Sequence, residues 1–164
     1  RKVPGAMKTV VVRGVGNLLR QDEGVGVHAV RALARGPCRE RAAFVDGGTA
    51  VFEALSGWRE IDQLVVLDAL RAGREPGSIA RLSPEQVSDR DGLPLSVHQH
   101  GLLDELAMLQ QAGLKVRSVV IYGVEPQQMG WGTELSEAVA RSLPRLEARL
   151  AGELGCTRCE ERPR

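Results

Sequence analysis

The stretch "GVGNLLRQDEGVGVHAV", residues 14–30, decides how the first part of the chain is interpreted. It overlaps the apolar run "KTVVVRGV" (8–15), which has the composition of a strand, and it leads into a helical pattern in residues 24–35. A strand, a glycine turn and a helix in this order are typical of a dinucleotide-binding turn. That fingerprint requires a third glycine, and Leu19 occupies its position.

Two acidic residues make phosphate binding at this turn unfavourable. Asp22 and Glu23 precede the predicted helix, where a pyrophosphate would lie. Two carboxylates at short range repel an anion. Helix capping or pairing with the helix dipole would explain one such acid. The turn therefore favours a cation over a nucleotide, and the residues alone leave open whether Asp22 or Glu23 binds it.

Strand-like and helix-like segments alternate along the rest of the chain. Further strands are predicted at 42–46, 63–70, 77–83 and 116–124, and further helices at 50–58, 96–113 and 133–154. The continuous apolar run in 63–70 indicates burial on both faces, as in the middle of a parallel sheet. The pattern predicts an α/β domain with a mostly parallel sheet and helices on both faces. We expect Pro144 to kink or split the last helix.

The length and charge of the chain limit the classes of protein to which it can belong. A chain of 164 residues with 43% apolar residues and a net charge of +1 is expected to fold as one domain, here residues 8–154. The balanced charge offers no case for a nucleic-acid partner. No apolar run approaches the roughly 18 residues of a membrane span, and the beginning of the chain does not resemble a signal peptide.

The cysteines suggest a reducing compartment. An odd number, three, argues against a disulfide framework, so a cytoplasmic location is expected. The spacing of "CTRC" (156–159) suits a metal, but a structural zinc needs four ligands and the chain has no second pair. We therefore expect residues 155–164 to form a reduced, disordered tail.

Acidic residues recur where the predicted strands end. Asp46, Asp68 and Glu125 follow three of them, in addition to the acidic turn. Ligands of such sheets bind at the carboxyl ends of the strands, so the pattern predicts an acidic crevice suited to a cation. A carboxylate at the end of a buried strand is unfavourable unless it is paired or bound to metal, although a turn or cap role for Asp68 is the alternative.

One histidine is expected to face this crevice. Ser96 and Gln99 form a capping box that opens the helix at 96–113, and its buried side is marked by Leu102, Leu106 and Leu109. At about 100° per residue, His98 lies near that side and His100 nearly opposite it. His28 falls on the apolar stripe of the first helix and is interpreted as a residue at the edge of the core with its hydrogen bonds satisfied, and not as a ligand. Two carboxylates and one imidazole suit a borderline divalent ion.

Several ordered motifs together resemble one family, the nickel–iron hydrogenase maturation endopeptidases. The resemblance covers about 8–150 and rests on "GVGNLLRQDEGVGVHAV" (14–30), "VDGGTA" (45–50), "LVVLDAL" (64–70), "SVHQHGL" (96–102), "GVEP" (123–126) and "LSEAVARSLPRL" (135–146). It implies a three-layer α/β/α sandwich around a mixed five-stranded sheet, with the strand at 77–83 antiparallel.

The resemblance also implies an activity and a site. Family members remove a C-terminal extension from the hydrogenase large-subunit precursor after nickel insertion. Their metal-binding positions correspond to Glu23, Asp68 and His98, with nickel bound by the enzyme or carried by the precursor. Asp68 is also a catalytic candidate, with Asp46 as a further one, and both an aspartic-type and a metal-assisted mechanism are open. The alternative is a non-catalytic nickel chaperone or sensor.

Overall fold

The computed structural model describes residues 8–49, 55–88 and 97–156, with the backbone alone for Ser88 and residues 97–102. Its elements, in chain order, are β1 (Val10–Val15), the 3-10 helix η1 (Gln21–Gly24), α1 (Val25–Leu33), β2 (Ala43–Gly48), β3 (Glu60–Ile61), β4 (Gln63–Ala69), β5 (Ile79–Leu82), α2 (Pro84–Ser88), α3 (Val97–Gln111), β6 (Lys115–Val116), β7 (Val119–Val124) and α4 (Glu137–Glu153).

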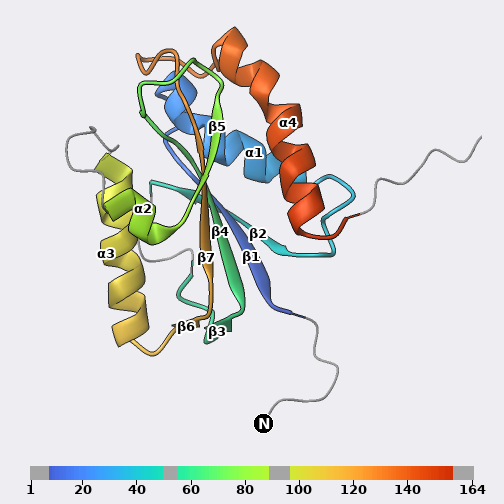
Figure 1. The fold of residues 1–164 in the computed structure, drawn as a ribbon, viewed down its shortest axis with the longest axis vertical. Helices are drawn as coiled ribbons and strands as arrows, with labels where there is room; N and C mark the ends of the chain where they lie inside the picture. Colours follow the sequence, from blue (N-terminus) through green and yellow to red (C-terminus); the bar gives the residue numbers. More distant parts are fainter. Residues whose placement is uncertain (1–7, 50–54, 89–96, 157–164) are drawn as a thin grey trace, which may run out of the picture.

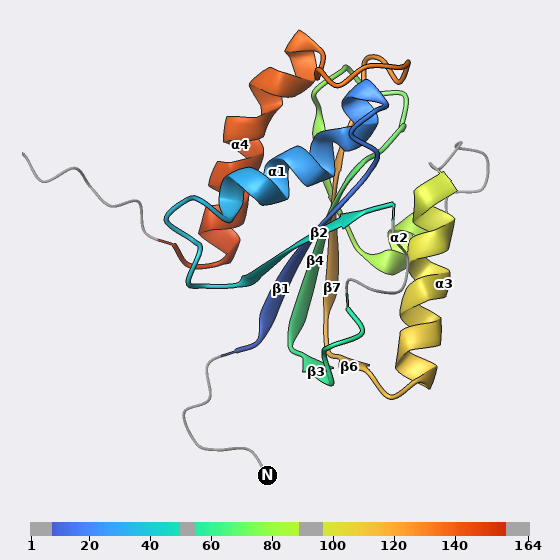
Figure 2. The ribbon, with the colours of Figure 1, turned by 180° about the vertical axis from the view of Figure 1, so that it is seen from behind.

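The main sheet has five strands in the order β2-β1-β4-β7-β5. The first four run parallel, and β5 pairs antiparallel with β7. Helices α1 and α4 cover one face, and α2 and α3 cover the other, as Figures 1 and 2 show from opposite sides. The predicted three-layer α/β/α sandwich with a mixed sheet is confirmed. A second sheet, the short parallel pair β3–β6, was not predicted, because strands of two residues have no detectable period.

The core consists of two apolar clusters, one on each face of the sheet. Successive residues of β4 alternate between them, with Leu64 and Val66 in the cluster under α3 and Val65 and Leu67 in the cluster under α1 and α4. All four are 0% exposed. The apolar run at 63–70 is therefore buried on both faces, as its composition predicted.

Gly26 allows α1 to lie directly on the ends of two strands. A Cβ atom on Gly26 would lie 2.1 Å from the carbonyl oxygen of Leu67 and 2.4 Å from that of Val15. Only a glycine permits so close an approach. The contact brings the start of α1, with η1 before it, to the carboxyl ends of β1 and β4, which point upward in Figure 1.

One predicted helix is absent from the residues that the structure describes, and one predicted helix is not divided at its proline. The helix expected at 50–58 is absent from its described part, since residues 55–57 form a turn, while 50–54 lie outside the described residues. Pro144 does not split α4, which runs unbroken from Glu137 to Glu153. Leu146 and Leu150 follow the proline and are 0% exposed, so their burial offsets the lost backbone hydrogen bond.

The expectation of reduced cysteines is wrong for one pair. Cys38, which follows α1, and Cys156, which follows α4, form a disulfide with their Cα atoms 5.7 Å apart. Their sequence separation of 118 residues concealed this contact, which depends on the packing of α1 against α4. Cys159 lies outside the described residues, and a cytoplasmic location stays a prediction. None of the helices described is both long and apolar enough to cross a membrane.

Candidate active site

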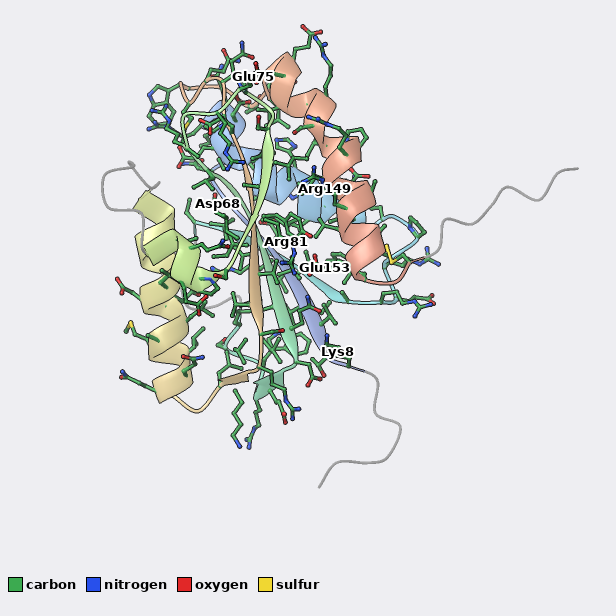
Figure 3. All side chains as sticks on the ribbon, in the orientation of Figure 1. Lys8, Asp68, Glu75, Arg81, Arg149 and Glu153 are labelled. Atoms are coloured by element: carbon green, nitrogen blue, oxygen red, sulfur yellow. A yellow bond between two sulfur atoms is a disulfide. The ribbon has the colours of Figure 1, made fainter. Side chains whose placement is uncertain are left out.

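Asp68 is a buried carboxylate at the end of the central strand. It is 2% exposed, and its Oδ1 accepts a hydrogen bond of 2.8 Å from the amide of Ala69. Figure 3 shows Asp68 toward the upper end of the sheet, where β4 finishes. Because a charge buried there is unfavourable without further interactions, the position suits a catalytic or ligating group.

Asp22, the first acid of the turn, has a structural role. Its side chain is completely buried and accepts hydrogen bonds from the amides of Gln127 and Gln128, both 2.9 Å, and from the amide and hydroxyl of Ser136, 2.7 and 2.8 Å. These bonds fasten η1 to the loop that precedes α4. With its two oxygens already surrounded by protein donors, Asp22 is poorly suited to bind a cation.

Glu23, the second acid, has different surroundings. Its side chain is 12% exposed, and its Oε2 lies 3.3 Å from Nε of Arg20. Arg20 in turn donates from Nη2 to the carbonyl of Met129 at 3.0 Å. Since η1 contacts β4, Glu23 belongs to the same end of the sheet as Asp68. The structure thus separates the two acids that the sequence left equivalent.

An unusual backbone at Gln21 helps to orient the two acids. Its φ of 50° lies in the left-handed region, which is uncommon for a residue with a side chain. The amide of Gln21 donates to Gly132 at 2.9 Å, and its side-chain Oε1 accepts from the amide of Gly130 at 2.9 Å. These long-range bonds hold the strained turn in place, and the local sequence gave no signal for them.

The other strand-end acids are engaged in local structure. Asp46 pairs with Arg31, whose Nη2 and Nε lie 2.7 and 2.8 Å from its Oδ2, and its Oδ1 accepts from the amide of Gly48 at 3.2 Å. Glu125 is 7% exposed and accepts from the amide of Ala72 at 2.7 Å. The expectation of one crevice in which all these acids face a cation is therefore too broad.

Helix α3 carries the predicted ligand His98, but the side chains of His98 and His100 lie outside the described residues. The register that placed His98 inward predicted Leu106 and Leu109 to be buried, and they are 6% and 7% exposed. Glu105 lies on the same side, 2% exposed, with its Oε2 2.6 Å from Nη1 of Arg13 on β1. This buried ion pair joins α3 to the sheet.

The described side chains do not by themselves form a metal site. No group of three or more His, Cys, Asp or Glu residues within the described part of the chain is arranged to hold an ion. The predicted set needs His98. His28, on α1, is partly buried, as expected for a residue at the edge of the core, but its buried Nε2 has no hydrogen-bond partner among the described residues.

Comparison with known proteins identifies the family. The family model described as "Hydrogenase maturation protease" (HycI) matches residues 27–153, well over half of the chain. The chain belongs to this protease family. The matched residues include Asp46, Asp68 and His98 and begin after Glu23.

Individual proteins named for hydrogenase maturation or expression are similar in sequence, and one solved structure is similar in fold. The Hydrogenase 2 maturation protease of Escherichia coli is 34% identical over 87% of this chain and 88% of its own length. The hydrogenase expression/formation protein HupD of Thiocapsa roseopersicina is 35% identical, and this chain spans 55% of its length. The solved structure of the hydrogenase maturating endopeptidase HybD from E. coli has a TM-score of 0.74 at 28% identity, over 90% of this chain and 92% of that one.

Proposed function

We propose that this chain is an endopeptidase that removes the C-terminal extension of a nickel–iron hydrogenase large-subunit precursor after nickel has been inserted. Membership of the hydrogenase maturation protease family supports this proposal. So does the similarity to the E. coli Hydrogenase 2 maturation protease, which extends over 88% of that protein. The observation that supports the site is that its acids have different surroundings. Asp22 and Glu125 accept hydrogen bonds from loop amides, whereas Asp68 is buried at the end of the central strand.

Glu23, Asp68 and His98 are the proposed metal ligands. Their donor set, two carboxylates and one imidazole, suits a borderline divalent ion such as nickel and leaves positions open. The largely buried Glu23 and the buried Asp68 provide the negative charge that a cation requires. An ion bound there would act as a Lewis acid or would mark a precursor that carries its nickel.

Asp68 is the proposed catalytic carboxylate. Peptide hydrolysis needs a base that takes a proton from the attacking water while the oxygen of that water bonds to the carbonyl carbon. The C–N bond then breaks, and the leaving amine accepts a proton. The buried side chain of Asp68 suits such a base, because burial limits competing hydration. Asp46 is the second candidate, in a positioning role, since its ion pair with Arg31 fixes it on the edge strand β2.

Mass spectrometry of the precursor tests the proposed function. Nickel-loaded and nickel-free large-subunit precursors are incubated with wild-type protein and with Asp68→Asn. We expect one C-terminal peptide to be released from the nickel-loaded precursor by the wild type alone. A complex that forms without any cleavage would instead indicate a nickel chaperone or sensor.

Calorimetric titration with nickel tests the ligand set separately. We expect His98→Ala to lose the binding site and His100→Ala to keep it, because the two residues lie about 200° apart around the helix. Unchanged binding in His98→Ala contradicts the ligand assignment. Loss of binding in a folded His100→Ala variant shows that the register of this helix is wrong.

A further inference from the structure

Two exposed apolar residues lie beside the turn that carries Glu23. Trp131, in the loop between β7 and α4, is 80% exposed, and Leu19, in the turn before η1, is 58% exposed. A backbone hydrogen bond connects their two segments: the amide of Gly132 donates to the carbonyl oxygen of Leu19 at 3.0 Å. In Figure 1 this loop lies beside the start of α1, at the end of the sheet where the parallel strands finish. We call Leu19, Arg20 and Trp131 the Trp131 rim.

The loop that carries Trp131 is held firmly on both sides of the indole. Gly130 donates to the side chain of Gln21 at 2.9 Å, and Gly132 accepts from the amide of Gln21 at 2.9 Å. The buried carboxylate of Asp22 fixes the preceding part of the loop. An aromatic group on a fixed backbone loses little conformational entropy on binding, and tryptophan is enriched among the residues that dominate protein interfaces.

Arg20 connects this aromatic group to the proposed site. Its Cζ lies 5.6 Å from the centroid of the Trp131 ring, within the range of a cation–π contact. Its Nε lies 3.3 Å from the carboxylate of Glu23. One guanidinium therefore contacts both the exposed indole and a proposed metal ligand, so a partner bound on Trp131 also affects the surroundings of Glu23.

We propose that the Trp131 rim is the surface on which the hydrogenase precursor docks, and that Arg20 couples docking to Glu23. This inference rests on the function proposed above. The expected occupant is an apolar segment of the precursor polypeptide near the extension that is removed. Such a segment competes with the guanidinium for the indole face. Docking then moves the positive charge of Arg20 away from Glu23 as the metal-loaded precursor arrives.

The position of Arg20 favours the precursor over a second copy of this chain as the occupant. A symmetric dimer formed through the Trp131 rim would bring the same patch of both copies together. Two Arg20 side chains would then approach each other at a surface that excludes water, where like charges are unfavourable. A substrate that docks beside Glu23 meets no such repulsion.

Steady-state kinetics with nickel-loaded precursor test the docking surface. We expect Trp131→Ala to raise KM about tenfold or more, with kcat changed by less than about twofold, and Trp131→Phe to recover most of the loss. Met108→Ala is the matched control, because Met108 is 51% exposed but lies on α3, and its KM should not change. Equal melting temperatures of these variants exclude a folding defect.

Nickel titration into the free protein tests the coupling. Removing the cation beside Glu23 should strengthen nickel binding, so we expect Arg20→Gln to bind nickel about twofold to fivefold more tightly than the wild type. Unchanged affinity overturns the role of Arg20.

The possible outcomes separate the two proposals. If the wild type cleaves the precursor and Trp131→Ala has an unchanged KM, the docking surface is wrong and the protease function stands. If the wild type cleaves no precursor, both proposals fail. If Trp131→Ala turns a dimer into a monomer in light scattering while KM is unchanged, the rim joins two copies and the docking proposal is overturned.

Discussion

Asp22 and Ser136 hold the first turn of the chain against the start of the last helix. The amide of Ser136 donates to Oδ1 of Asp22 at 2.7 Å, and the hydroxyl donates to Oδ2 at 2.8 Å. The same hydroxyl caps α4 by accepting a hydrogen bond from the amide of Val139 at 3.4 Å. One buried carboxylate therefore orders both the turn that carries Glu23 and the loop that carries Trp131.

We expect Asp22→Asn to lower the free energy of unfolding by about 2 kcal/mol or more. An amide replaces one acceptor oxygen by a donor, which would then face the amides of Gln127 and Gln128 or of Ser136. Urea denaturation measures the change. Asp46→Asn is the control for stability, because its ion pair with Arg31 is partly exposed and should contribute no more than about 1 kcal/mol. An equal effect of the two substitutions would contradict a structural role specific to Asp22.

The buried pair of Arg13 and Glu105 gives a second prediction. Their side chains are 3% and 2% exposed. Burial raises the pKa of Glu105 and outweighs the hydrogen bond from Arg13, which lowers it. We expect Glu105→Ala to destabilise the fold by about 3–5 kcal/mol, because it leaves the guanidinium buried without this carboxylate.

The double variant Arg13→Met with Glu105→Met removes both charges but keeps side chains that can pack. It therefore distinguishes the cost of an unpaired buried charge from the cost of lost packing. We expect it to recover most of the unfolding free energy, since well-packed apolar residues often replace a buried pair without loss. Denaturant unfolding of both variants checks this. A Glu105→Ala variant that unfolds at the wild-type midpoint would show that the pair does not hold α3.

Glu153 should make stability depend on acidic pH. Burial raises its pKa, but hydrogen bonds from Arg81 and Tyr122 outweigh burial, so its pKa lies below the usual value. Gln63 also donates to it at 3.0 Å, and Figure 3 shows Arg81 beside Glu153. A carboxyl group whose pKa is lower in the folded state stabilises the fold fully above its unfolded-state pKa, and this contribution is lost as pH falls through the folded-state value.

Melting temperatures of wild type and Glu153→Gln at several pH values test this. We expect the substitution to cost about 1–2 kcal/mol at neutral pH and the difference to shrink below about pH 4. A difference that stays constant down to strongly acidic pH would show that the ionised form of Glu153 has no special role.

The layers of the fold were predictable because they follow from patterns within short stretches of the sequence. The apolar run in β4 and the alternation of strands with helices determine a sheet covered on both faces. The antiparallel β5 came from the family resemblance. Short elements without a period, such as β3 and β6, could not be predicted in this way.

The candidate site was only partly predictable because its acids differ in long-range contacts. Asp22 and Glu23 have the same charge and adjacent positions, yet Asp22 bonds to residues more than 100 positions away, such as Gln127 and Gln128. The pair formed by Asp46 and Arg31 depends likewise on the packing of α1 against β2. Pairing of Cys38 with Cys156 has the same origin, since α1 and α4 meet only in the folded chain.

Processing of nickel-loaded precursor by Glu23→Gln is the most direct test of the proposed site. Asp22→Asn removes the same charge one position away, but its buried hydrogen bonds make it unsuitable as a control. Glu134→Gln is better matched, because Glu134 is exposed on the loop before α4. Glutamine keeps the size of Glu23, so the melting temperature should stay close to that of the wild type. We predict a folded Glu23→Gln that releases no peptide, beside a fully active Glu134→Gln. Full activity in a folded Glu23→Gln would contradict the assignment of Glu23 to the site.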